Sequence, residues 1–163
     1  MTSLGKKWRN LVTYEYASCN DGTARSGKTT RAQELAKSLG APIVSPDAIR
    51  IVVHGHRYYA PCEDLVWAQA RIMVKALFEA GHKVVIFDAT NTCRKNRDNL
   101  AHWGRDPDGQ TWTVEFEHIE TDVEECISRA KSTGMPDLIP VITNKARGYQ
   151  PPQSYERRHG DNQ

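Results

Sequence analysis

Hydrophobic positions along the chain follow two patterns, short apolar runs and longer stretches with an apolar residue at every third or fourth position. The short runs predict strands, at Leu11–Ala17, Pro42–Ser45, Lys83–Phe87 and Thr111–Ile119. The longer stretches predict helices, at Lys28–Leu39, Glu63–Ala80, Asn91–Trp103, Asp122–Lys131 and, with breaks at Pro136 and Pro140, Met135–Arg147. Strands and helices that alternate in this way are typical of an α/β fold with a parallel sheet.

The segment Glu63–Ala80 gives the clearest helical signal. Its apolar residues are spaced by three and four, and they are Leu65, Ala68, Ile72, Met73, Ala76, Leu77 and Ala80. Thr121 is expected to cap the helix that follows it. We expect the three tryptophans Trp67, Trp103 and Trp112 to belong to the core.

Composition narrows the class of protein. The chain has 163 residues, of which 39% are hydrophobic and 26% charged, as in a globular domain. We expect one domain over residues 1–149 and a flexible tail over 150–163, because the tail has no apolar period. No apolar run approaches the about 20 residues that a membrane-spanning helix needs. The net charge of +2 is far from that of a chromatin-type protein, but it allows a nucleic-acid substrate held by a local patch.

Four cysteines lie far apart in the sequence, at Cys19, Cys62, Cys93 and Cys126. They form no CxxC pair, so neither a zinc site nor a redox motif is indicated. No apolar segment follows the basic residues near Met1, so we see no secretory signal. Reduced thiols in a cytoplasmic protein are the expected state.

The segment Gly22–Thr29 reads GTARSGKT and matches the pattern G-x-x-x-x-G-K-[ST]. Its glycines let the backbone curl so that N–H groups point at phosphate oxygens, and the helix that begins at Lys28 adds the positive end of its dipole. Lys28 would reach the β- and γ-phosphates, and the Thr29 hydroxyl would bind Mg²⁺. The residues expected to bind the nucleotide are Gly22, Thr23, Ala24, Arg25, Ser26, Gly27, Lys28, Thr29 and Thr30. The alternative is a Gly-rich turn before an ordinary helix.

Asp47 follows the predicted strand Pro42–Ser45, and Arg50 lies one helical turn further on the same face. Ligands of open α/β sheets bind at the carboxyl ends of the strands, so Asp47 should reach that edge and take a proton from an attacking hydroxyl. The planar fork of Arg50 suits a phosphate on the acceptor. Alternatively, Asp47 caps the helix Ala48–Val53 and Arg50 is solvated.

Asp88 ends the apolar strand Lys83–Phe87, as in the Walker B pattern. It would hold Mg²⁺ through water or fix the acceptor, and Asn91 would bind the acceptor or cap the next helix. Capping at the end of the strand is the alternative for this motif. A GTPase is disfavoured because Arg147 stands where the guanine-binding aspartate of an N-K-x-D signature belongs, and the chain is too short for the usual motor and helicase cores.

Together, GTARSGKT at 22–29, SPDAIR at 45–50 and VVIFDATN at 84–91 resemble the P-loop kinases of the polynucleotide 5′-hydroxyl kinase type. The resemblance spans about residues 11–152. It implies an adenylate-kinase-like, three-layer fold with a central parallel sheet and a short helical lid at about 129–140. It also implies ATP as the phosphoryl donor, Mg²⁺ as cofactor and a nucleic acid with a 5′-hydroxyl end as substrate.

The resemblance implies a role for each matched residue. Asp47 matches the general base, Arg50 matches the arginine that binds the neighbouring phosphate of the acceptor, and Lys28 matches the contact to the triphosphate. Arg129 matches the first arginine of the lid, which stabilises the charge of the transferring group. The chain departs from the family at Thr133, where a second lid arginine is often found; the nearest cation is Lys131.

Other interpretations stay open. The chain would alternatively be a P-loop kinase of a small metabolite or modified RNA, or a nucleotide-binding regulator without catalysis. The basic residues Arg94, Lys95 and Arg97 form either a path for a nucleic-acid strand or a solvated helix face. The segment His54–Tyr59 mixes basic and aromatic residues, which suits base stacking or an ordinary loop that packs its tyrosines.

Overall fold

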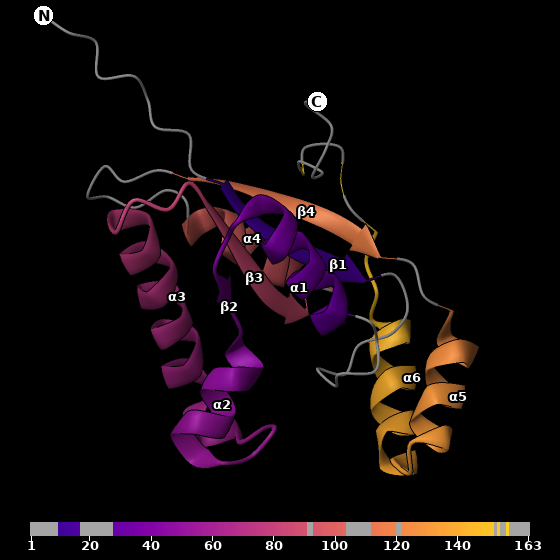
Figure 1. The fold of residues 1–163 in the computed structure, drawn as a ribbon. Helices are drawn as coiled ribbons and strands as arrows, with labels where there is room; N and C mark the ends of the chain where they lie inside the picture. The colour runs from indigo at the N-terminus through magenta and orange to yellow at the C-terminus, as the bar shows by residue number, and fades with distance from the viewer. Residues whose placement is uncertain are drawn as a thin grey trace, which may run out of the picture.

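Four strands form a parallel sheet in the computed structural model, which describes residues 10–16, 28–90, 93–103, 112–119, 122–151, 153 and 156 (Figure 1). The strands are β1 (Asn10–Tyr16), β2 (Ile43–Val44), β3 (Val84–Thr90) and β4 (Thr113–Ile119). They lie in the order β2-β3-β1-β4, and each neighbouring pair is parallel. The predicted α/β fold with a parallel sheet is therefore confirmed.

Helices connect the strands. They are α1 (Lys28–Leu39), α2 (Pro46–His54), α3 (Glu63–Glu79), α4 (Arg94–Trp103), α5 (Val123–Ser132) and α6 (Ile139–Arg147), with single 3₁₀ turns at Ala60–Cys62 and Pro136–Leu138. The bounds of α1 are those predicted. The predicted last helix, Met135–Arg147, splits into a 3₁₀ turn and α6, because each proline lacks a backbone N–H and fits only the first turn of a helix.

Two hydrophobic layers enclose the sheet, as expected of a three-layer fold. Side chains of a strand alternate between the two faces of a sheet. In β3, Val85 and Phe87 pack in the larger cluster with α3 and Leu100 of α4. Ile86 packs on the opposite face, against Ala32 of α1. This alternation decides which helix each residue at the end of β3 faces.

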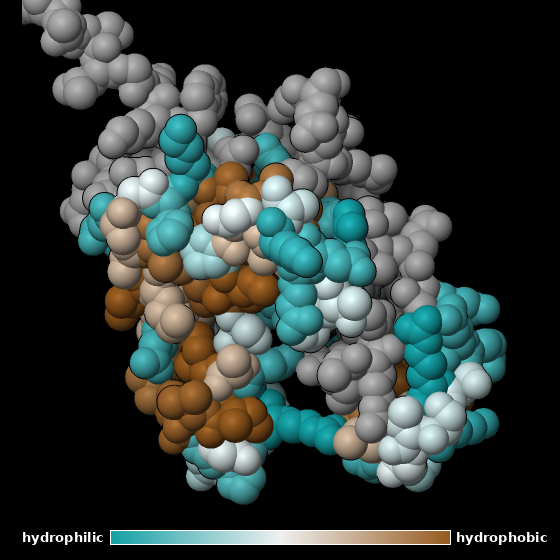
Figure 2. Space-filling model, in the orientation of Figure 1, coloured by the Kyte–Doolittle hydropathy of each residue, from teal (hydrophilic) through white to brown (hydrophobic). Residues whose placement is uncertain are grey.

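The side of α3 that is buried is not the side marked by the apolar residues from whose spacing the sequence predicts this helix. The buried residues are Val66, Ala70, Val74 and Phe78. Most of the apolar residues singled out by spacing lie on the open side; Leu65 is 54% exposed and Ile72 67%. Figure 2 shows this hydrophobic colour over α2 and α3. Apolar residues occur on more than one side of α3, so periodicity identifies the helix but cannot select its buried face.

The helices α5 and α6 form a hairpin with a hydrophobic cluster of its own. Its buried members are Cys126, Ala130, Leu138 and Ile142. The helix α5 is capped by Asp122, whose carboxylate accepts from the backbone N–H of Glu124, and Thr121 is therefore not its cap. Gly134 has a φ of 71°, the left-handed conformation that glycine favours, where the chain turns towards α6. The hairpin includes the range 129–140, for which a lid was predicted from the family resemblance.

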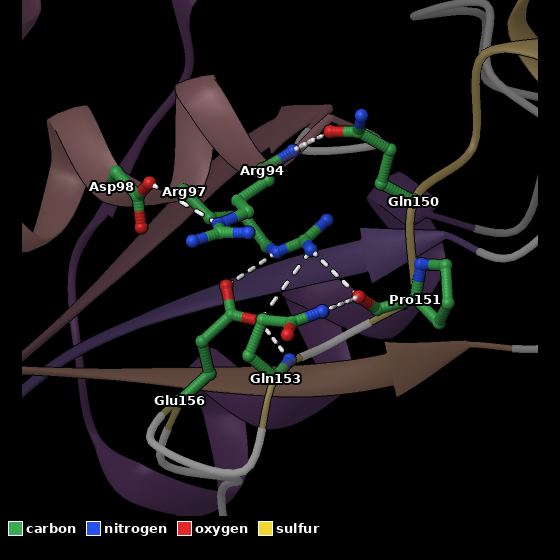
Figure 3. A network of polar contacts seen from close by, with 7 residues as sticks. All are labelled: Arg94, Arg97, Asp98, Gln150, Pro151, Gln153 and Glu156. Atoms are coloured by element: carbon green, nitrogen blue, oxygen red, sulfur yellow. Dashed lines mark hydrogen bonds and ion pairs between the residues drawn. The ribbon is translucent and has the colours of Figure 1, made fainter.

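Residues after Gln150, predicted to belong to a flexible tail, contact α4 (Figure 3). The guanidinium of Arg97 donates to the carboxylate of Glu156 at 2.6 Å and to the carbonyl of Pro151 at 3.2 Å. The exposed fractions of the two charged side chains are 0% for Arg97 and 4% for Glu156. Gln150 accepts from the backbone N–H of Arg94. These described residues are held against α4 instead of extending away from it.

Two cysteines, Cys62 and Cys93, are free thiols, in line with the expectation. Cys126 is in a disulfide bond, contrary to the expectation of reduced thiols. None of the helices in the described ranges combines the length and the apolar character that crossing a membrane requires.

Candidate active site

Thr29 and Asp88 face each other where the carboxyl ends of the parallel strands meet the first turn of α1. The alternation along β3 places Asp88 on the same face as Ile86, which is the face that α1 covers. The hydroxyl of Thr29 donates to the carboxylate of Asp88 at 3.4 Å between oxygens. Asp88 is buried, with an exposed fraction of 4%. The fold therefore joins two motifs that lie 59 positions apart in the sequence.

The strand β3 is irregular at Asp88. Thr13 of β1 pairs with Phe87 of β3, but the next residue, Tyr14, pairs with Thr90, so the register skips Asp88 and Ala89. Such irregularities bend a strand and redirect its side chains, and they are common beside active sites. Here the irregularity falls at the residue that meets Thr29.

The pair of Thr29 and Asp88 fits Mg²⁺ by the chemistry of its donors. Mg²⁺ takes oxygen ligands and keeps several waters, and in kinases it is bound by one or two protein oxygens together with substrate phosphates. The Thr29 hydroxyl and the Asp88 carboxylate oxygen are 3.4 Å apart, which is longer than an ordinary hydrogen bond between two oxygens. Both oxygens face the same small space. No group of three or more His, Cys, Asp or Glu side chains that could hold a metal occurs in the part of the chain that the structure describes.

The other predicted nucleotide-binding residues are placed only in part. Gly22–Gly27 lie outside the described residues, as does the predicted acceptor residue Asn91. Lys28 is the first residue of α1, as the motif requires, and its side chain also lies outside the description. Thr30 is an exposed residue of the first turn of α1.

Asp47 and Arg50 lie on α2, directly after β2, and they are in contact. The guanidinium of Arg50 donates to the carboxylate of Asp47 at 2.6 Å. The cap of α2 is Ser45, whose hydroxyl accepts from the N–H of Ala48, and this arrangement removes the alternative in which Asp47 is the cap. Asp47 keeps 35% of its side chain exposed, while Arg50 keeps 12%. The carboxylate is therefore open to solvent, and the guanidinium is not simply solvated.

Glu63, the first residue of α3, completes this group. Arg50 donates to it twice, from Nε and from Nη2, each at 2.7 Å. The hydrogen bonds from Arg50 lower the pKa of Glu63, and the same bonds raise the pKa of Arg50. Trp67, one turn further along α3, also contributes to the lowered pKa of Glu63. We call Asp47, Arg50, Glu63 and Trp67 the acceptor-side network.

Sequence reasoning missed Glu63. The sequence indicates Glu63 only indirectly. A half-buried arginine needs a carboxylate partner, and Glu63 is the first residue of the helix that follows. The bonds to Asp47 and Glu63 use three of the five N–H donors of Arg50 in the described residues. Two donors are left to bind a further anion.

Arg129, the predicted lid arginine, lies on the last turns of α5 and pairs with Glu125 of the same helix. Thr133, at the position of the expected second arginine, donates its hydroxyl to the carbonyl of Arg129 and ends the helix. Figure 2 shows the surface hollowed between α2–α3 and the α5–α6 hairpin. Arg57, just after α2, reaches Met135 of the hairpin at 3.3 Å. The α2–α3 helices and the α5–α6 hairpin thus lie on either side of this hollow.

Two open interpretations are also decided by the structure. Arg97 is buried in its pair with Glu156, so it does not belong to an exposed basic path. In the segment His54–Tyr59, the ring centroids of His54 and Tyr59 lie 5.8 Å apart and those of His54 and His56 5.9 Å apart, as in a loop that packs its own rings. Tyr58 stays 67% exposed.

Comparisons with known proteins agree with this fold. A family model described as an AAA domain matches residues 22–134, more than half of the chain. A sugar kinase from Janibacter sp. HTCC2649 is 19% identical with a TM-score of 0.60, over 93% of this chain and 83% of that chain. A putative kinase from Chloroflexus aurantiacus J-10-fl is 14% identical with a TM-score of 0.64, over 94% and 86%.

A chain of the Pnkp1/Rnl/Hen1 RNA repair complex is 16% identical with a TM-score of 0.60, over 92% of this chain and 50% of that chain. A search of the curated proteins found no match. At these identities the structural likeness establishes the fold, and it does not single out the polynucleotide kinase type. The chain belongs to the AAA domain family and has the fold of the P-loop kinases, which supports phosphotransfer and leaves the acceptor open.

Proposed function

We propose that the chain is an ATP-dependent kinase that transfers the γ-phosphoryl group to the 5′-hydroxyl of a polynucleotide. The observation that carries the proposal is the placement of two pairs at the same edge of the sheet. Thr29 and Asp88 lie at the start of α1, where a triphosphate would be held. Asp47 and Arg50 follow the neighbouring strand β2, where an acceptor would approach.

In this mechanism Asp47 takes the proton of the acceptor hydroxyl as the hydroxyl oxygen bonds to the γ-phosphorus. The bond between that phosphorus and the bridging oxygen breaks, and ADP leaves with the electron pair. Mg²⁺, held through Thr29 and Asp88, would neutralise charge on the phosphates when bound. Lys28 and Arg129 would supply the remaining positive charge around the transferring group.

Arg50 favours an acceptor that carries a phosphate beside the reacting nucleoside. Its guanidinium is fixed by Asp47 and Glu63, and its two remaining donors suit a phosphate oxygen pair. A polynucleotide with a 5′-hydroxyl has such a phosphate on the 3′ side of its first nucleoside. The likeness to a chain of an RNA repair complex supports the same class of acceptor.

A kinase of a small hydroxyl compound is the second candidate. It is favoured by the likeness to a sugar kinase and to a gluconokinase from Sinorhizobium meliloti 1021. Such a substrate lacks the neighbouring phosphate, so it would leave the two remaining donors of Arg50 unused.

An acceptor panel tests the proposal. The protein is incubated with labelled ATP, Mg²⁺ and, in separate reactions, 5′-hydroxyl DNA and RNA oligonucleotides, nucleoside 3′-phosphates, nucleosides, gluconate and simple sugars. We expect transfer to acceptors with a 3′-phosphate, much less to plain nucleosides, and none in Lys28→Ala. Transfer to gluconate or a sugar alone would establish the second candidate, and ATP binding without transfer to any acceptor would indicate a regulator.

A further inference from the structure

A pocket of about 490 Å³ lies between the start of α3 and the length of α4, on the face of the sheet opposite α1. Its lining includes Asp64 and Trp67 from α3 and Asn96, Asn99, His102 and Trp103 from α4. Its volume falls within the roughly 300–1,000 Å³ of small-molecule sites. Of these residues, Trp67 also belongs to the acceptor-side network, and the others have no role in the phosphotransfer described above.

One wall of the pocket is aromatic. The rings of Trp67 and Trp103 meet edge to face with centroids 6.1 Å apart, and Phe87 of β3 lies beneath both, 6.1 Å from Trp67 and 5.4 Å from Trp103. The two tryptophans were expected in the core, and they do pack against it, but each stays partly exposed. Two large, fixed, partly exposed rings provide a platform for a flat group at small entropic cost.

The other side of the pocket is polar. The two amides of Asn96 and Asn99 can each donate and accept, Asp64 accepts, and His102 provides a further ring nitrogen. This mixture matches the edge of a nucleobase, which carries donors and acceptors side by side. The carboxylate of Asp64 makes the pocket unsuited to a phosphate.

The pocket lies beside the acceptor-side network. Trp67 lies one helical turn from Glu63 on α3, Glu63 accepts from Arg50, and Arg50 donates to Asp47. The pocket thus begins where the acceptor-side network ends. If an acceptor binds Arg50 through its phosphate, a second part of the same acceptor would occupy this pocket.

We propose that this pocket binds the base of the 5′-terminal nucleotide of the acceptor, with the base stacked on Trp67 and its edge read by Asn96 and Asn99. The proposal rests on the proposed function, because it assigns the place of the base in the same substrate. It predicts that the enzyme recognises its acceptor by base, phosphate and hydroxyl together.

The test compares two labelled 5′-hydroxyl oligonucleotides that differ only in whether the first nucleotide carries a base or is abasic. Binding is measured by fluorescence anisotropy without ATP, so it needs no turnover. Loss of one stacked base weakens binding about tenfold. We expect this preference in the wild type and in Gln69→Ala, an exposed residue of α3 outside the pocket. We expect it to disappear in Trp67→Ala and to fall in Asn99→Ala.

Trp67→Ala also changes the surroundings of Glu63, but that change affects both oligonucleotides equally, so the preference isolates the base. If Trp67→Ala does not fold by circular dichroism, Asn99→Ala and His102→Ala decide the outcome, since both residues are exposed. A preference that survives all these variants, equal binding of both oligonucleotides by the wild type, or competition by gluconate but not by nucleosides would overturn the proposal. If the base preference depends on the pocket but no phosphoryl group is transferred to the same oligonucleotide, the proposed function is rejected and the proposed base pocket is supported.

Discussion

At the scale of single residues, the guanidinium of Arg50 organises the acceptor side of the site. It bridges the exposed carboxylate of Asp47 and the more buried carboxylate of Glu63. Glu63 holds it with two bonds and Asp47 with one, so Asp47 can turn to a hydroxyl while Arg50 stays in place. The proposed base and the proposed phosphate-binding residue therefore have separable roles.

Asp47→Asn should lower kcat by about 10² to 10⁴ while ATP binding is unchanged, because an amide cannot take the proton of the acceptor. Steady-state turnover on the best acceptor and equilibrium ATP binding check this prediction. Glu34→Gln is the matched control, since Glu34 is an exposed carboxylate of α1 that pairs only across one helical turn with Arg31 at 3.5 Å. Turnover of Asp47→Asn within twofold of the wild type would remove Asp47 as the base.

Glu63→Gln should lower the free energy of unfolding at pH 7 by about 1–3 kcal/mol. Arg50 lowers the pKa of Glu63 in the folded protein, so the ion pair stabilises the fold above the unfolded pKa of about 4.3 and is lost as the pH falls through the folded value. The difference between wild type and Glu63→Gln should therefore be constant above pH 5 and shrink below about pH 4.3. Urea unfolding at several pH values measures it; a difference that does not change with pH would contradict the ion pair.

At the scale of elements, α4 depends on residues that follow α6. The side chain of Arg97 is fully buried, and its charge is balanced by Glu156, which lies 59 positions later in the chain. Gln153 donates its backbone N–H to the same carboxylate (Figure 3). Since α4 also forms one side of the proposed base pocket, this contact fixes both the stability and the position of that wall.

Glu156→Gln should cost about 3–5 kcal/mol of stability, because it removes the buried carboxylate that pairs with Arg97. The double variant Arg97→Met with Glu156→Met should regain most of this loss, since it removes both charges. Urea unfolding of the full chain gives both values. A loss below about 0.5 kcal/mol for Glu156→Gln would show that the contact with the tail does not hold α4.

At the scale of the whole molecule, the sheet positions two helical lobes around one edge. The α2–α3 lobe packs in the core of the sheet, whereas the α5–α6 hairpin has its own cluster of buried side chains. Arg57 and Met135 connect the two lobes across the hollow, through a weak hydrogen bond to sulfur. A hairpin with a separate core can shift without exposing the core of the sheet.

The charge of the molecule predicts a weak dependence on salt. The net charge is +2, and burial of Arg97 removes one cation from the suggested basic path. If Arg50 neutralises one phosphate, the logarithm of kcat/KM for a single-stranded acceptor should fall against the logarithm of salt concentration with a slope of about −0.7. Oligonucleotides of different lengths should give the same slope. A slope several times steeper, or one that grows with length, would indicate a long basic path.

Local patterns predicted much of the fold. The spacing of apolar residues predicted α1 to the residue and located the other elements within a few positions, because helix and strand periods are local properties. The parallel sheet then requires residues at strand ends to share one edge, which is how the contact between Asp88 and Thr29 arises.

The sequence by itself thus determined the kind of fold, the order of its elements and two carboxylates near the carboxyl edge of the sheet, one towards the end of β3 and one at the start of α2. Only the tertiary structure decided the buried face of α3, the pairing of Arg50 with Glu63, the burial of Arg97 against Glu156 and the pocket beside Trp67. Each of these depends on which side chains from distant segments fill the same space. Residue types and spacing do not specify that choice, since several faces of one helix can be apolar and several carboxylates can balance one arginine.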